Sequence, residues 1–282
     1  MLKLSRHTEL TRQFVRPHYH PNESKLNFLL WMAQHPFKSW RAGRQLMRDI
    51  GDDVPPIWSQ EIAGKRVLIM GSGPSLDRVS DDFFDGFDVI VHVNFALRRL
   101  RTGTTAYFFT TDLGAIMGYM DKFGVDAFRH VGRERSVLAP VFFDYYRMMT
   151  DEGRALFTVM KPDAVEWRAQ KVNLGPLRLP LALRYHPVQP DWAHYDVHSP
   201  SRSIAIIDHT SALSAVLFAA QNGAAEIGLI GCDFSAGRAA TVESTQQVPD
   251  DKMFGGAAAE FRQMEAALAR QGIAVTNHSW QV

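Results

Sequence analysis

The stretch that decides the fold is residues 65–77, which read KRVLIMGSGPSLD. Residues 65–71 form an apolar run with the length of a central strand in a parallel sheet. The run leads into a turn of two glycines, a proline and two serines. Backbone N–H groups in such a turn can approach an anion closely, and a helix starting nearby adds a favourable dipole. The stretch therefore predicts a strand followed by a phosphate-holding turn, with a purely structural tight turn as the alternative.

Two common phosphate motifs do not fit this turn. Leu76 stands where a dinucleotide fingerprint needs a third Gly or Ala, and the next apolar run ends in Asn94 rather than in an acidic residue that binds ribose hydroxyls. The Gly-Lys-Ser/Thr of a P-loop is absent as well. These departures argue against a dinucleotide site and against a P-loop.

Apolar strand-length runs alternate with helical segments along much of the chain. Further strands are predicted at 87–94, 105–111, 136–143, 155–160, 226–231 and 273–277. Helices are predicted at 210–223 and 255–272, and each ends in a glycine. This alternation predicts an α/β fold, with a mostly parallel sheet and helices on both faces.

The composition is that of an ordinary soluble globular protein. Of 282 residues, 46% are hydrophobic and 22% are charged. The net charge of +1 gives no overall field that would favour nucleic acid. Cys232 is the single cysteine, which excludes a disulfide framework and indicates a reducing compartment. No secretory signal or membrane-spanning stretch is recognisable, so we expect a cytoplasmic protein.

The N-terminal region differs in charge from the rest. Residues 1–50 hold nine Lys or Arg and three Asp or Glu, a local excess of +6. We therefore divide the chain into a basic, aromatic arm with helices at 1–56 and one nucleotide-binding domain at 57–282, with an irregular insert at about 161–203. Basic and aromatic residues in 25–50 can lie on the inner membrane surface as a peripheral anchor. The alternative is that they pack on the domain or on a partner subunit of a homo-oligomer.

Polar residues follow the predicted strands. Ser72, Asn94, Thr110–Asp112 and Asp233–Ser235 each stand where a strand ends. In open α/β sheets, ligands bind at the carboxyl ends of the strands. Thr210 and Ser211 begin a predicted helix, where they form a good N-cap and offer hydroxyl and N–H groups to an anion. We expect these groups to line one cleft.

Three blocks of this sequence resemble a known family. They are VLIMGSGPSLD (67–77), FDVIVHVNFA (87–96) and TSALSAVLFAAQNGAAEIGLIGCDFS (210–235). In this order they are similar to blocks of the bacterial sialyltransferases of glycosyltransferase family 42 and of related lipopolysaccharide and capsule glycosyltransferases. The resemblance covers roughly residues 64–115 and 203–277. It implies a GT-A-like single sheet that binds a CMP-activated acidic sugar without a metal or other cofactor.

The resemblance also implies roles for individual residues. The nucleotide would lie near the turn, Asn94 would contact its phosphate or sugar, and Thr210 and Ser211 would meet the phosphate or the sugar carboxylate. The substrate-binding set is Gly71, Ser72, Gly73, Pro74, Ser75, Asn94, Thr111, Thr210, Ser211, Asp233, Phe234 and Ser235, of which the last three would line the cytidine pocket. Asn277 and Ser279 lie near the polar segment that follows the family's last strand. The chain has no Asp-x-Asp, which agrees with a single-phosphate leaving group that hydroxyl and amide donors can stabilise.

The sequence departs from the family at the catalytic side of the cleft. Ser235 replaces the tyrosine that binds the leaving phosphate, and no histidine occurs in residues 235–256, where the family places its general base. An attacking hydroxyl needs a proton acceptor within hydrogen-bond reach. We take His209 and Ser211 as the candidate catalytic residues. The alternative bases are Asp250, Asp251, His194, His198 and His278.

The expected function is a metal-independent, inverting glycosyltransferase. It would transfer sialic acid or a Kdo-like ulosonic acid from a CMP-sugar to a glycan or glycolipid acceptor that is a cell-surface precursor. The first alternative is a pterin diphosphokinase-like enzyme, which GSGPSLD and LIGCDF also resemble and which would need Mg²⁺ carboxylates. The second is a binding protein with a degenerate glycosyltransferase fold, which binds its ligand but catalyses no transfer.

Overall fold

The computed structural model describes the chain at residues 9–15, 41, 43–50, 55–99, 103–141, 149–162, 165–174, 177–199, 210–242 and 254–282. The predicted base His209 and the alternatives Asp250 and Asp251 lie outside these residues. Most of the predicted arm, including residues 16–40 and 51–54, lies outside them too. The domain boundary expected between residues 56 and 57 falls within the described stretch 55–99.

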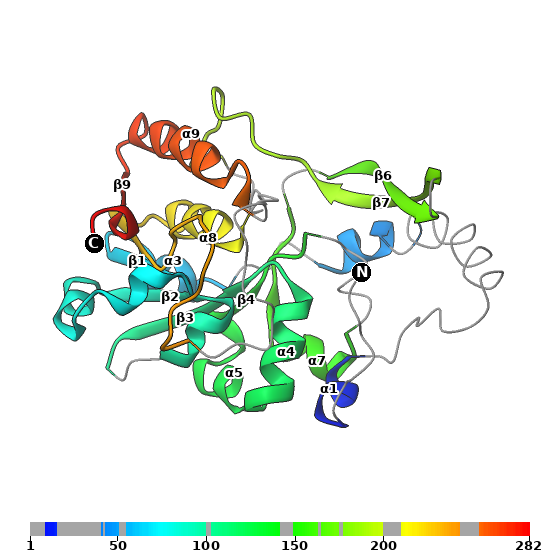
Figure 1. Cartoon of the computed structure of the whole chain (residues 1–282), viewed down its shortest axis with the longest axis horizontal. Coiled ribbons are helices and arrows are strands. Elements are labelled where there is room, and N and C mark those ends of the chain that lie inside the picture. Colours follow the sequence, from blue (N-terminus) through cyan, green and yellow to red (C-terminus); the bar gives the residue numbers. More distant parts are fainter. Residues whose placement is uncertain are drawn as a thin grey trace.

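A seven-stranded parallel sheet forms the centre of the fold (Figure 1). Its strands are β1 (Arg66–Met70), β2 (Val89–Val93), β3 (Thr105–Thr110), β4 (Ser136–Leu138), β5 (Thr158–Val159), β8 (Glu226–Ile230) and β9 (Ala274–Asn277). They lie in the order β5-β4-β3-β2-β1-β8-β9, and every adjacent pair is parallel. The α/β fold class is confirmed, and each strand overlaps its predicted range. The finer expectation of a GT-A-like domain stays a prediction.

Helices cover both faces of this sheet (Figure 1). On one face Val67 and Ile69 pack with α3 (Ile57–Ile62), α8 (Ser211–Gln221) and α9 (Ala257–Ala269). On the other face Leu68 and Met70 pack with α4 (Leu113–Phe123) and α5 (Asp126–Val131). Successive strand residues point to opposite faces, so a strand covered on both sides must be apolar throughout. That requirement explains why β1 is apolar from Val67 to Met70.

Short elements complete the main body. They are α1 (Glu9–Phe14), α7 (Asp151–Arg154) and the 3₁₀ turns η1 (Pro74–Asp77), η2 (Asp81–Gly86), η3 (Asn94–Arg99), η4 (Arg133–Arg135) and η6 (His278–Trp280). α1 and the residue after it belong to the core, because Phe14 and Val15 are both buried in the layer of α4 and α5. Val15 also forms a β-bridge with Met149. Residues 9–15 of the predicted arm are therefore packed on the domain.

The insert expected to be irregular contains regular structure. β6 (Val165–Leu174) and β7 (Leu177–Pro187) form a two-stranded antiparallel hairpin. Its register shifts between Gln170 and Lys171, as at a β-bulge. The bulge interrupts the period-2 pattern by which a strand is recognised in sequence, and this is why the hairpin was not predicted.

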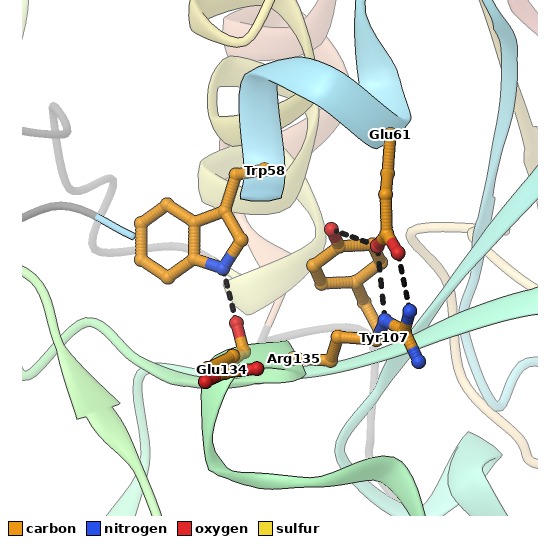
Figure 2. A network of polar contacts seen from close by, with 5 residues as sticks. All are labelled: Trp58, Glu61, Tyr107, Glu134 and Arg135. Atoms are coloured by element: carbon orange, nitrogen blue, oxygen red, sulfur yellow. Dashed lines mark hydrogen bonds and ion pairs between the residues drawn. The ribbon is translucent and has the colours of Figure 1, made fainter. Parts of the chain in front are cut away.

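A polar network fastens α3 to the amino edge of the sheet (Figure 2). The hydroxyl of Tyr107 donates to Glu61 at 2.7 Å, and Nε of Arg135 donates to the same carboxylate at 2.9 Å. The indole N–H of Trp58 donates to the carbonyl of Glu134. The bond from Arg135 holds the pKa of Glu61 below its usual value, while burial and the nearby Glu61 raise the pKa of Tyr107. Glu61 is thus an anion held by two partners.

We predict that Glu61→Gln lowers the free energy of unfolding by about 2 kcal/mol, because it removes a charged acceptor shared by two donors. Since the pKa of Glu61 is lowered in the folded state, this contribution is present above the ordinary glutamate pKa and is lost as the pH falls below it. Urea denaturation at pH 7 measures the effect. The control is Glu226→Gln, whose exposed ion pair with Arg66 should be worth less than about 1 kcal/mol. Equal losses in the two variants would contradict the prediction.

Candidate functional site

The strand order places a topological switch point between β1 and β8. From β1 the chain builds the sheet outward through β2 to β5, and it then returns to the other side of β1 with β8 and β9. Ligands of open parallel sheets bind at such a point, beyond the carboxyl ends of the strands. The loops that leave β1 and β8, at 71–73 and 231–233, meet there.

Three glycines allow these two loops to touch. A Cβ on Gly71 would overlap the carbonyl oxygen of Gly231, and a Cβ on Gly73 would overlap the carboxylate of Asp233. Gly231 has φ +66°, and a Cβ there would overlap the carbonyl of Gly71. The N–H of Gly73 donates to the carbonyl of Gly231 at 2.7 Å. The glycines of the turn are therefore required by close backbone packing between two loops of the protein itself.

The carboxylate of Asp233 occupies the start of η1. It accepts from the Ser75 N–H at 3.2 Å and from the Ser75 hydroxyl at 2.8 Å. The Ser75 hydroxyl oxygen accepts in turn from the N–H of Gly231 at 3.1 Å. An anion was predicted at this turn, and the anion bound there is an aspartate from the neighbouring loop. The N–H groups of Gly73 and Ser75 thus both have partners within the chain.

We predict that Gly73→Ala lowers the free energy of unfolding by about 3 kcal/mol, because the new methyl group must displace Asp233 or separate the two loops. The matched control is Gly86→Ala, where the nearest atom to a new Cβ is a flexible arginine nitrogen 3.8 Å away. Thermal and chemical denaturation of both variants provides the comparison. Equal stability of Gly73→Ala and the wild type would show that the two loops are not interlocked.

A second set of polar contacts joins the ends of β2 and β3 to α8. The hydroxyl of Thr110 donates to the Asn94 side-chain oxygen at 2.6 Å. The hydroxyls of Thr111 and Ser211 lie 2.6 Å apart. Thr210 caps α8 by accepting from the N–H of Ala212 at 3.3 Å, as predicted from its position. The predicted residues from two strand ends and one helix start thus lie along a single edge of the sheet.

Two residues of this edge have an unusual backbone. Asn94 has φ +53° and Phe234 has φ +52°. Among the non-glycine residues that the structure describes, these two alone have positive φ. The left-handed region is tolerated by Asn but strained for an aromatic residue. Such strain persists where surrounding contacts enforce it and gathers at functional sites, so it favours a functional role for this edge.

The loop after β8 is held from β9. The amide of Asn277 donates to the carbonyl of Cys232 at 3.0 Å, and the hydroxyl of Ser279 accepts from the N–H of Cys232 at 2.9 Å. The Cys232 thiol is buried, which raises its pKa to about 12. Asn277 and Ser279, expected near a polar ligand segment, therefore position the loop that carries Asp233.

The end of that loop presents an aromatic group. Phe234 packs against Phe261 and Trp280, with ring centroids 5.8 and 6.1 Å away. Ser235 is exposed. Trp280, which the sequence analysis did not single out, is 45% exposed and donates its indole N–H to the carbonyl of Asp233 at 3.4 Å. The segment predicted to line the cytidine pocket, Asp233–Ser235, thus lies beside the exposed ring of Trp280.

The alternative histidine bases lie away from Ser211. His194 directly precedes Tyr195, and His198 follows it by three residues. The hydroxyl of Tyr195 accepts from Gln221, the last residue of α8. Ser211 is the first residue of this 11-residue helix, so about 15 Å of helix separates the two ends. The ring of His278 packs against Phe83, 5.3 Å between centroids, and against Phe87. In these positions none of the three is placed to take a proton beside Ser211.

A further histidine lies on β2, two residues before Asn94. His92 is fully buried, and this burial lowers its pKa to about 4. A ring nitrogen lies 3.2 Å from the carbonyl of Ala96, while the other ring nitrogen has no partner among the described residues. His92 is therefore neutral at physiological pH and inaccessible to an acceptor substrate.

Comparison with known proteins adds no relative: no family model, curated protein or solved structure matches the chain. The resemblance to glycosyltransferase family 42 therefore stays a prediction. Among the residues described, no helix is long and apolar enough to cross a membrane. In the same part of the chain, no three His, Cys, Asp or Glu side chains gather to form a metal site.

Proposed function

We propose that this chain is a metal-independent, inverting glycosyltransferase that moves an acidic sugar from a CMP-sugar to a cell-surface glycan precursor. The observation that carries the proposal is the polar carboxyl edge of the sheet beside its switch point. There Asn94 is bonded to Thr110 and Thr111 to Ser211, which brings together the ends of β2 and β3 and the start of α8. Doubly wound parallel sheets bind nucleotides at this location.

Each group at the edge has a role in this proposal. The N-terminus of α8 offers a favourable dipole to the anionic donor, and Thr210 offers its hydroxyl hydrogen, because only its oxygen is used in the cap. Ser211 is buried and bonded to Thr111, so in this proposal it holds Thr111 in place at the donor site. Asn94, held in its left-handed conformation, presents its amide to the phosphate or the sugar. Asp233 acts indirectly, because its carboxylate holds the turn through Ser75. His209, next to the α8 N-cap in sequence, is the proposed general base.

This donor set suits a monophosphate leaving group. Fixed hydroxyl, amide and N–H donors aimed at developing charge are among the strongest sources of transition-state stabilisation in proteins. A nucleoside diphosphate leaving group carries more charge and is usually neutralised through carboxylate-bound Mg²⁺. The proposal therefore requires that the protein binds CMP more tightly than UDP.

The diphosphokinase alternative has weaker support. It needs carboxylates to hold Mg²⁺ at the strand ends. Asp112 caps α4 by accepting from the N–H of Gly114 at 2.7 Å, and Asp233 is bound to Ser75. Both carboxylates thus have structural tasks.

We predict that isothermal titration calorimetry will give a Kd for CMP at least about tenfold lower than that for UDP, and that excess EDTA will not change it. Ser211→Ala should weaken CMP binding about two- to tenfold, the effect of one neutral hydrogen bond. The matched control is Ser214→Ala, one turn further along α8 and fully buried, which should leave the affinity unchanged.

Two outcomes of these titrations and one of a turnover assay would overturn parts of the proposal. Equal affinity for CMP and UDP would exclude a CMP-sugar donor. Loss of binding with EDTA would favour the diphosphokinase reaction. If CMP binds tightly but no CMP is released from any CMP-sugar offered with acceptor glycans, the result would favour the catalytically degenerate binding protein.

A further inference from the structure

Residues 237–242 form a strap that lies on the glycine turn. The N–H of Ala239 donates to the carbonyl of Ser72 at 2.9 Å. Thr241 donates its N–H to the Asp77 carboxylate at 3.3 Å, and the N–H of Ala240 donates to the same carboxylate. Ala239 is almost fully buried, as is Val242 at the end of the strap. The strap is thus attached to the loop after β1 by several independent contacts.

The strap carries one cation, Arg238, to the carboxyl edge. Its guanidinium carbon lies 5.7 Å from the centroid of the Phe95 ring, and Phe95 directly follows Asn94 in the chain. Its neighbour Ala239 is bound to Ser72, at the end of β1. β1 and β2 are paired strands, with Met70 opposite His92. Arg238 is therefore held between the loops that leave two adjacent central strands.

The guanidinium of Arg238 is chemically suited to a phosphate. The residue is only partly exposed, and burial lowers the pKa of its guanidinium. Arginine nevertheless stays protonated in proteins, so a positive charge is held in a partly desolvated place. Its planar fork of donors matches the oxygens of a phosphate in a bidentate arrangement. The N–H groups of Gly73 and Ser75, the donors first expected to hold that phosphate, are already bound to Gly231 and Asp233.

We infer that Arg238 binds the phosphate of the donor nucleotide, beside Ser72 and Asn94. The identity of that nucleotide as CMP rests on the proposed function, whereas the phosphate site itself rests on the position of Arg238. The nucleotide phosphate then lies next to the glycine turn, and Asp233 remains on Ser75. No residue of the strap belongs to the ligand set that the family resemblance implies.

Titration of CMP and of cytidine into wild-type protein and Arg238→Gln tests this assignment. We expect the variant to bind CMP about ten- to hundredfold more weakly, the effect of losing a charged hydrogen bond, and to bind cytidine like the wild type. Arg238→Lys should show an intermediate loss, because it keeps the charge without the fork. The matched control is Arg66→Gln, at the amino edge of β1, where the arginine also lies over an aromatic ring, that of Phe87, at 5.4 Å. This control should keep the wild-type affinity for CMP.

The outcomes separate this inference from the proposed function. Tight CMP binding that is unchanged in Arg238→Gln overturns the inference and leaves the function standing. An equal loss for CMP and cytidine also overturns it, because the role of Arg238 would then be structural. If UMP, AMP or GMP binds instead of CMP and Arg238→Gln weakens it, the phosphate site stands and the CMP-sugar function falls. Absence of binding by every nucleotide overturns both the inference and the proposed function.

If Arg238→Gln does not fold, the binding of CMP and cytidine is compared on Arg238→Lys instead. Unchanged CMP binding by that variant overturns the inference.

Discussion

The contact between the loops after β1 and β8 is the constraint on which the rest of the carboxyl edge depends. The carboxylate of Asp233 accepts from Ser75, the N–H of Gly73 donates to the carbonyl of Gly231, and none of Gly71, Gly73 and Gly231 has room for a Cβ. The two loops extend the strand pairing of β1 with β8 beyond the sheet. The strap at 237–242 lies on the joined loops, and Asn277 and Ser279 hold them from β9. A change at this contact would therefore move several groups of the edge together.

The residues predicted to bind the ligand fall into two groups, and these two groups have different roles. The turn at Gly71–Ser75 and the loop at 231–233 form a joint, in which glycine and carboxylate serve packing and hydrogen bonding inside the protein. The adjoining edge, with Asn94, Thr111 and Ser211, carries polar groups at paired strand ends and a helix start. In our proposal the ligand is bound by this second part and by Arg238. The joint gives the binding groups fixed positions without contacting the phosphate through Gly73 or Ser75.

The sheet was predictable from the sequence because a strand buried on both faces is almost wholly apolar, as β1 is from Val67 to Met70 and β2 is apart from His92. The hairpin β6–β7 was not predictable, since a register shift at Gln170/Lys171 and Pro180 in β7 both interrupt the strand pattern.

The polar residues at the edge were predictable as strand-end residues. Their partners were not: the Ser75–Asp233 bond joins residues 158 positions apart, and only the folded chain brings them together. Arg238 was missed because it belongs to a short, irregular segment, whose position depends on the contacts of Ala239 and Asp77.

A crystal structure of the full chain with CMP bound tests this account most directly, because it distinguishes the joint from the binding edge. We expect the phosphate within hydrogen-bond distance of the Arg238 guanidinium, beside Asn94, with the carboxylate of Asp233 still on Ser75. A phosphate seated on the N–H groups of Gly73 and Ser75, with Asp233 displaced, would contradict the account. It would show that the glycine turn is the anion site after all.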